Sequence, residues 1–203
     1  MKGHTAARLA WSLWGVCVVF IVLPSLISDE NLPLLESLLV PLWIGTISGV
    51  GGLIAARQSR NPIGWIMLAI GVLIAIHILA RDYATHALLD DPSSVIGEVM
   101  AWLSSWVAIP GLALGTFFVL LFPDGRLLSP GWRPVAWITA VVTALITVGS
   151  ATAPGGIEGF GEVENPVGIG TSLRNVWIAT SRLAPNLVGP NQFSGHFSDC
   201  PLR

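Results

Sequence analysis

Charged side chains are scarce in this sequence. Lys and Arg number 10 and Asp and Glu number 12, so 11% of the 203 residues are charged and 53% are hydrophobic. A soluble domain carries about 25% charged residues, and so few polar groups cannot cover a globule in water. The net charge of −2 gives no reason to expect a nucleic-acid partner. The composition therefore predicts a membrane protein.

Metal-ligating and nucleophilic residues are also few. The two cysteines, Cys17 and Cys200, lie far apart, so we predict neither a disulfide nor a metal site. Gly49-Val50-Gly51-Gly52 lacks the Lys-Ser/Thr of a phosphate-binding loop, and no cofactor is expected. No Ser, His and Asp grouping suggests a catalytic site, so we predict no enzymatic activity for this chain. The four histidines include no pair with metal-ligand spacing: His4, His77, His86 and His196.

Long apolar runs, in contrast, are abundant. About 20 residues in a helix cross a hydrocarbon core of ~30 Å. Five runs have this length, at residues 9–28, 34–56, 63–80, 98–122 and 135–153. The first is longer than the apolar part of a usual signal peptide, and we expect it to stay as a membrane helix. The sequence predicts an all-α integral membrane helix bundle over residues 1–153.

The composition changes after residue 153. Residues 154–172 are acidic and Gly-rich and are expected to form an extracytoplasmic loop. Residues 173–203 are expected to form a disordered tail outside the membrane. The alternative is a sixth span over residues 171–189. That span would have to absorb Arg174 and Arg182, at about 2.5–3.5 kcal/mol for each arginine placed at a helix centre.

The basic residues alternate from loop to loop. They precede the first and third spans and lie between the fourth and fifth, as Lys2, Arg8, Arg57, Arg60, Arg126 and Arg133. The other loops hold one basic residue, Arg81, and most acidic ones: Asp29, Glu30, Asp82, Asp90, Asp91, Glu158, Glu162 and Glu164. The positive-inside rule then predicts a multi-pass protein of the cell membrane with its N-terminus in the cytoplasm.

A polar hinge, Phe122 to Pro134, separates the last two spans. Within it, Pro123-Asp124-Gly125 predicts a tight turn, because Pro fixes φ, Asp can accept from the backbone ahead and Gly permits positive φ. Asn61-Pro62 predicts the capped start of the third span. The related Asn165-Pro166-Val167-Gly168 is read as the same turn pattern used again.

Three ionisable residues lie within or beside the spans and are candidates for stimulus sensing: Glu36, His77 and Glu98. Buried ionisable groups in a bilayer often mark ligand sites or proton paths. Glu36 and Glu98 lie within about a turn of the outer ends, where a carboxylate can reach water. His77 is expected about one turn from the outer end of its helix and can change charge near neutral pH.

Other features favour packing or partner contact. Gly45 and Gly49, like Gly111 and Gly115, are small pairs that allow close helix packing. Trp102 and Trp106 are four residues apart and share a helix face. They are expected to belong to an aromatic belt at the membrane interface or, alternatively, to line a small apolar ligand pocket. Candidate cytoplasmic contacts for a partner are Arg57, Arg60, Asp124, Arg126 and Arg133, whose arginines could equally anchor the helices to anionic lipid.

Four motifs together resemble a known family: Asn61-Pro62-Ile63-Gly64-Trp65, Leu121-Phe122-Pro123-Asp124-Gly125-Arg126-Leu127, Trp132-Arg133-Pro134-Val135-Ala136-Trp137 and Glu164-Asn165-Pro166-Val167-Gly168-Ile169. In order and spacing they are similar to the membrane-embedded N-terminal region of certain bacterial sensor histidine kinases. The resemblance covers about residues 5–170. It implies a membrane input module followed, in the family, by a phosphoacceptor helix and an ATP-binding domain.

The kinase motifs of that family do not follow residue 170, and the remaining residues are fewer than the about 50 that a domain needs. We therefore expect a truncated sensor module of a two-component system, acting in the lipid bilayer with a second copy or a partner signalling protein. Two alternatives are a small membrane transporter or channel subunit and a non-functional gene remnant. A transporter predicts ionisable residues deep in several spans, whereas the deep positions here are mostly aliphatic or Gly.

Overall fold

The computed structural model describes residues 3–27, 34–127, 129–160 and 163–168, and their side chains except those of residues 25–27 and 34–38. Each predicted span corresponds to one helix. The helices are α1 (Gly3–Ile27), α2 (Leu34–Arg57), α3 (Pro62–Asp90), α4 (Val95–Leu121) and α5 (Arg133–Thr152), with a short 3₁₀ helix η1 (Pro130–Trp132) before α5. All five α-helices are long and apolar enough to cross a membrane. The predicted all-α membrane helix bundle is confirmed, and the protein is a multi-pass membrane protein.

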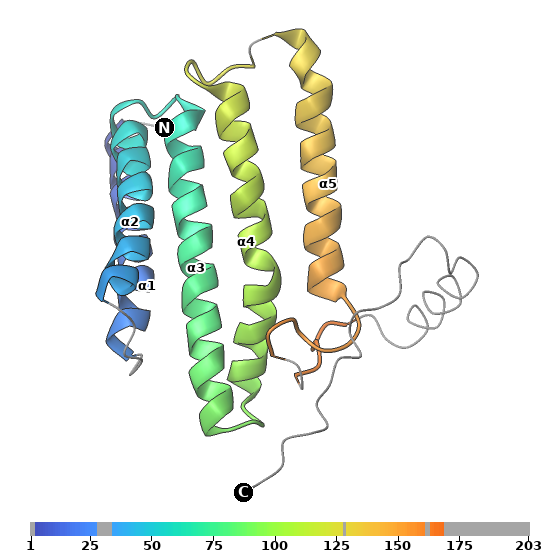
Figure 1. Ribbon diagram of the computed structural model, residues 1–203. Helices are drawn as coiled ribbons and strands as arrows, with labels where there is room; N and C mark the ends of the chain where they lie inside the picture. The colour runs from blue at the N-terminus through green and yellow to red at the C-terminus, as the bar shows by residue number, and fades with distance from the viewer. Residues whose placement is uncertain (1–2, 28–33, 128, 161–162, 169–203) are drawn as a thin grey trace, which may run out of the picture. The chain divides into compact units, whose positions relative to one another are not determined.

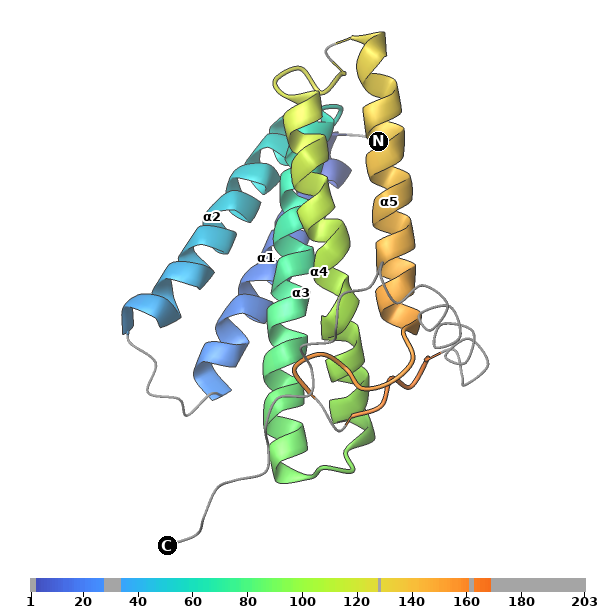
Figure 2. The same ribbon diagram turned by 45° about the vertical axis from the view of Figure 1, so that its right-hand side comes forward.

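Helix α3 is central among the five helices (Figure 1). It packs against α1, α2 and α4, whereas α5 packs against α4 at the edge (Figure 2). One end of the bundle carries the hinge and the α2–α3 turn, and we call it the hinge end. The opposite end carries the α3–α4 turn and the segment after α5, and we call it the loop end (Figure 1).

The α2–α3 contact depends on glycine. A Cβ added at Gly51 would lie 2.7 Å from Leu68 N, and one at Gly64 would lie 2.6 Å from Ala55 N. Gly71 likewise lies directly against Ser48. The two backbones therefore approach too closely for any side chain at these positions.

In each of the two predicted small-residue pairs, only one glycine lies at a close helix–helix contact. Gly49 faces Trp14 of α1 and Gly111 faces Leu73 of α3, but a Cβ added at Gly45 or Gly115 would have nothing within 4 Å. The tight crossing instead uses Gly51, Gly64 and Gly71. Spacing of four alone does not identify the glycines, because any glycine on the facing side of a helix permits the approach.

The start of α3 is capped as predicted. Asn61 Oδ1 accepts a hydrogen bond from Ile63 N at 3.0 Å, and Pro62 occupies the first turn. The predicted hinge turn lies against this cap: Gly125 has φ +70°, and a Cβ there would lie 2.5 Å from Pro62 Cδ. Gly125 N donates to Leu121 O at 2.7 Å to close the turn, whereas the exposed Asp124 side chain makes no hydrogen bond within the described part of the chain.

Helix α3 is longer than its predicted span. It continues ten residues past residue 80 to Asp90, so Arg81, Asp82 and Asp90 lie on a helix and the prediction that they lie in a loop is wrong. His77 consequently lies well inside α3, not one turn from its end. The apolar run ends near residue 80, whereas residues 81–90 stay helical because Ala84 and Leu88 still pack against α4 and the loop beyond α5.

The α3–α4 turn is closed by its own side chains. Asp91 Oδ1 accepts from Ser93 Oγ at 2.6 Å and from Ser93 N at 2.9 Å, and these bonds lower the pKa of the Asp91 carboxyl. Ser94 Oγ caps α4 by accepting from Gly97 N at 3.3 Å.

Two predicted features lie outside what the structure describes. Glu36 lies in the first turns of α2, but its side chain is not among those described. The alternative sixth span, at residues 171–189, falls within residues 169–203, which are also outside the described residues.

Candidate functional site

The segment after α5 folds back over the loop end, and we call residues 154–160 and 163–168 the capping loop. Ile157 N donates to Val163 O at 2.9 Å, and an antiparallel bridge pairs Gly156 with Glu164. Ile157 is 5% exposed and packs in a cluster with Ala84 of α3 and Ala101 of α4. The part of the predicted 154–172 loop that the structure describes is thus a folded cap.

Asn165 fixes the capping loop to the end of α5. Its Nδ2 donates to Ala153 O at 2.8 Å and Ala151 O at 3.1 Å, while its Oδ1 accepts from Val167 N at 2.9 Å. The last bond repeats the Asn61 arrangement and confirms the reused turn pattern. Trp102 Nε1 of α4 also donates to Ala151 O, at 2.7 Å. Trp102 therefore joins α4 to α5. The sequence suggests that it belongs to an interfacial aromatic belt or to a small apolar pocket, and neither interpretation includes this contact.

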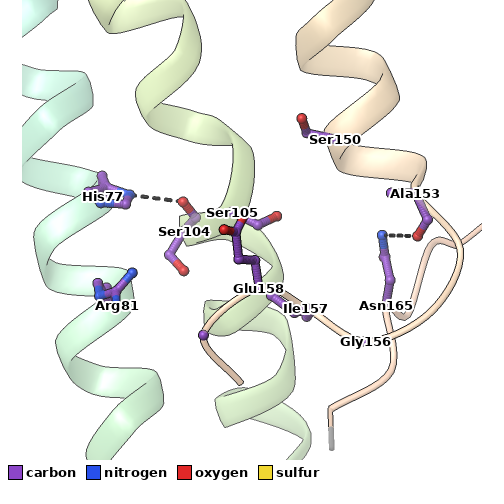
Figure 3. Close-up of a pocket in the computed structure, with 11 residues that line it drawn as sticks. His77, Arg81, Ser104, Ser105, Ser150, Ala153, Gly156, Ile157, Glu158 and Asn165 are labelled. Atoms are coloured by element: carbon purple, nitrogen blue, oxygen red, sulfur yellow. Dashed lines mark hydrogen bonds between the residues drawn. The ribbon is translucent and has the colours of Figure 1, made fainter. Parts of the chain in front are cut away.

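A polar cavity of about 610 Å³ lies beneath the capping loop, between α3, α4 and α5 (Figure 3). Its floor is formed by partly buried or buried residues of the three helices, and its rim by exposed residues of α3 and the loop. Small-molecule sites typically measure about 300–1,000 Å³. The lining residues are His77, Arg81, Ser104, Ser105, Ser150, Ala153, Gly156, Ile157, Glu158, Gly159 and Asn165.

His77 joins α3 to α4 at the cavity floor. Its Nδ1 lies 2.8 Å from Ser104 O (Figure 3). A carbonyl oxygen can only accept, so Nδ1 carries a proton, and in the neutral form of the imidazole Nε2 is an acceptor. Nε2 makes no hydrogen bond within the described residues. The structure thus places this predicted sensing residue in a cavity, in a hydrogen bond between two helices.

Two serines of α4 add further acceptors. Ser104 Oγ donates to Ala101 O at 2.8 Å, and Ser105 Oγ donates to Trp102 O at 2.7 Å. Each hydroxyl proton is therefore used within the helix, and each oxygen keeps lone pairs for an incoming donor.

The rim carries one group of each charge. Arg81 lies one turn beyond His77 on the same face of α3, and Glu158 comes from the capping loop (Figure 3). Within the described part of the chain, neither side chain makes an ion pair or a hydrogen bond. A Cβ at Gly159 would lie 3.6 Å from Arg81 Nη2, which places the guanidinium beside the loop backbone.

The other candidates lie elsewhere. Glu98 is partly buried in the first turn of α4, near the helix end as predicted, and lines a second cavity of about 440 Å³ that shares Gly159 with the first. All candidate contacts of the hinge end are exposed or partly exposed: Arg57, Arg60, Asp124, Arg126 and Arg133. The contact of Gly125 with Pro62 brings the hinge and the α2–α3 turn together at this end.

Sequence reasoning found His77 but missed the rest of the cavity. Arg81 stood out as a lone basic residue among acidic ones, and its spacing of four from His77 was the available signal. Ser104, Ser105 and Glu158 gave no such signal, because the packing of α4 against α3 brings the two serines to His77 and the folding of the capping loop adds Glu158. Among the described residues, no group of three or more His, Cys, Asp and Glu side chains could hold a metal ion.

Comparisons with protein-family models, with curated proteins and with solved structures found no match to this chain.

Proposed function

We propose that this chain is a membrane sensor module that receives a stimulus in the cavity at the loop end and presents the response at the hinge end. The observation that carries the proposal is the polar cavity itself. It combines a size suited to a small molecule with unpaired charges on its rim and a hydrogen bond between α3 and α4 at its floor. The motif pattern of a sensor kinase's input region points to the same role.

The helices that line the cavity also reach the opposite end. Both α3 and α4 are continuous from the loop end to the hinge end, and the hinge turn that follows α4 lies against the cap of α3. A ligand that bound one packing of α3 against α4 more tightly would shift the population toward it. The same shift would alter the Gly125–Pro62 contact, where a partner protein or second copy could read it.

The charge distribution supports a cytoplasmic hinge end. Among the described residues, the loop end holds one arginine, Arg81, whereas the hinge end holds Arg8, Arg57, Arg60, Arg126 and Arg133. The acidic residues show the reverse bias. By the positive-inside rule, α1 then begins in the cytoplasm and the cavity faces the outside.

A transporter would need polar or charged side chains along a path through the bundle. The fully buried polar residues among those described are Ser48 and Ser104, and Ser48 Oγ is bonded to Ile44 O at 2.8 Å within its own helix. Two further polar atoms are buried without a hydrogen bond, Trp106 Nε1 of α4 and Thr147 Oγ1 of α5, and neither is ionisable. This distribution favours a binding cavity at one end of the bundle over a transport path.

The orientation is tested with reporter fusions after Gly131 in the hinge and after Gly168 at the end of the capping loop. We expect activity of a cytoplasmic reporter at Gly131 and of an extracytoplasmic reporter at Gly168, because an odd number of spans precedes the second site and an even number the first. The opposite pair of results would place the cavity in the cytoplasm and overturn the proposed direction of signalling.

A further inference from the structure

We propose that the cavity at the loop end binds a small zwitterion: a group with a protonated amine that donates N–H bonds, joined to a carboxylate or phosphate. This inference rests on the proposed function, because it names the ligand class of the same cavity. It follows from the inventory of donors and acceptors that line the cavity, taken from the floor to the rim.

The floor accepts hydrogen bonds. His77 Nδ1 and the Ser104 and Ser105 hydroxyls all donate to helix carbonyls, at 2.8, 2.8 and 2.7 Å. What these groups still offer a ligand are the lone pairs of His77 Nε2 and of two hydroxyl oxygens. Ser150 Oγ of α5 makes no hydrogen bond within the described residues and can donate or accept. A ligand that engages His77, Ser104 and Ser105 must therefore bring donors, and an ammonium group brings three of them.

The rim adds a charge of each sign. The Arg81 guanidinium presents its donor fork, which matches a carboxylate or phosphate in bidentate geometry. The Glu158 carboxylate lines the same cavity without forming an ion pair with Arg81 (Figure 3). A plain anion would meet repulsion from Glu158, and a plain cation would meet repulsion from Arg81. A zwitterion satisfies both groups and the floor together.

Two sources share this chemistry. One is a soluble amino acid or amino phosphate, and the other is the headgroup of an ethanolamine phospholipid from the surrounding bilayer. A matched pair of probes isolates the shared feature. Phosphoethanolamine and phosphocholine both carry a phosphate and a cationic nitrogen, but the quaternary nitrogen of phosphocholine has no N–H donor.

The experiment is calorimetric titration of the full chain in nanodiscs made only of phosphatidylcholine. We expect phosphoethanolamine to bind at least about tenfold more tightly than phosphocholine, because the acceptor floor is satisfied only by N–H donors. Arg81→Gln should weaken phosphoethanolamine at least about tenfold, and Arg81→Lys less, since it keeps the charge but loses the fork. Arg60→Gln at the hinge end is the matched control and should leave the affinity unchanged.

Equal binding of the two probes, no binding of either, or an affinity that Arg81→Gln leaves unchanged would overturn the ligand class. Adding phosphatidylethanolamine to the nanodiscs separates the two sources. Weaker apparent binding of the soluble probe would identify the lipid headgroup as the occupant, and unchanged binding would identify a soluble ligand. Binding that leaves hydrogen exchange at the hinge end unaltered would support the ligand class and overturn the sensor function.

Discussion

Replacing Gly64 by alanine is expected to destabilise the bundle by about 1–3 kcal/mol, the usual cost of forcing extra atoms into a packed core. The new Cβ would lie 2.6 Å from Ala55 N, 2.9 Å from Gly51 O and 2.9 Å from Ile54 Cγ2. Two of these neighbours are backbone atoms of α2, so relief requires the helices to move apart. The free energy of unfolding in detergent micelles, followed by circular dichroism, measures the effect.

Gly115→Ala in α4 is the matched control for this substitution. Gly115 is also a mid-helix glycine, but nothing lies within 4 Å of its Cβ position. We expect this variant to be neutral or more stable by up to about 1 kcal/mol, because alanine favours the helix over glycine. Equal stability of the two variants would contradict the close α2–α3 approach.

Gly125→Ala is expected to have the second large effect, a loss of about 1–3 kcal/mol in the hinge region. Two causes act together. The φ of +70° is unfavourable for any residue with a Cβ, and that Cβ would lie 2.5 Å from Pro62 Cδ and 3.0 Å from Asn61 Oδ1. The hinge should therefore detach from the cap of α3. Faster hydrogen exchange at the amides of residues 61 and 125 would report this loss of contact.

Gly131→Ala provides the comparison within the same hinge. Gly131 does not have positive φ, and its Cβ position has only Ser129 Oγ nearby, at 3.6 Å, which is ordinary contact. Exchange at Asn61 and Gly125 should stay at the wild-type rate in this variant. Similar acceleration in both variants would mean that the hinge is sensitive to any added methyl group and would refute the specific contact.

The sequence was sufficient to predict the helices because each span is a long apolar run, and it predicted the caps because Asn61 and Pro62 act locally. It did not predict the full length of α3, since the apolar run stops near residue 80 whereas Ala84 and Leu88 continue to pack against α4 and the capping loop. The cavity could not be predicted from the sequence either, because its lining residues are far apart in the chain. His77 and Ser104 are 27 residues apart, and Glu158 joins them only because Ile157 is buried against α3 and α4.

The central claim, that the cavity communicates with the hinge end, is tested most directly by amide hydrogen exchange after the cavity is filled. Ser105→Trp places a large side chain in the cavity, and Leu112→Trp on the same helix is the control, because Leu112 is 70% exposed on the bundle surface. Changed exchange at Ile157 in the capping loop would verify that the cavity is perturbed.

In Ser105→Trp we predict that exchange at the Gly125 and Asn61 amides changes about fivefold or more, the lower range of typical coupling between sites, and that Leu112→Trp leaves it unchanged. These amides donate to Leu121 O and Gln58 O at the hinge end, far along α3 and α4 from the substitution. A changed rate at Ile157 together with wild-type rates at Gly125 and Asn61 would contradict the account.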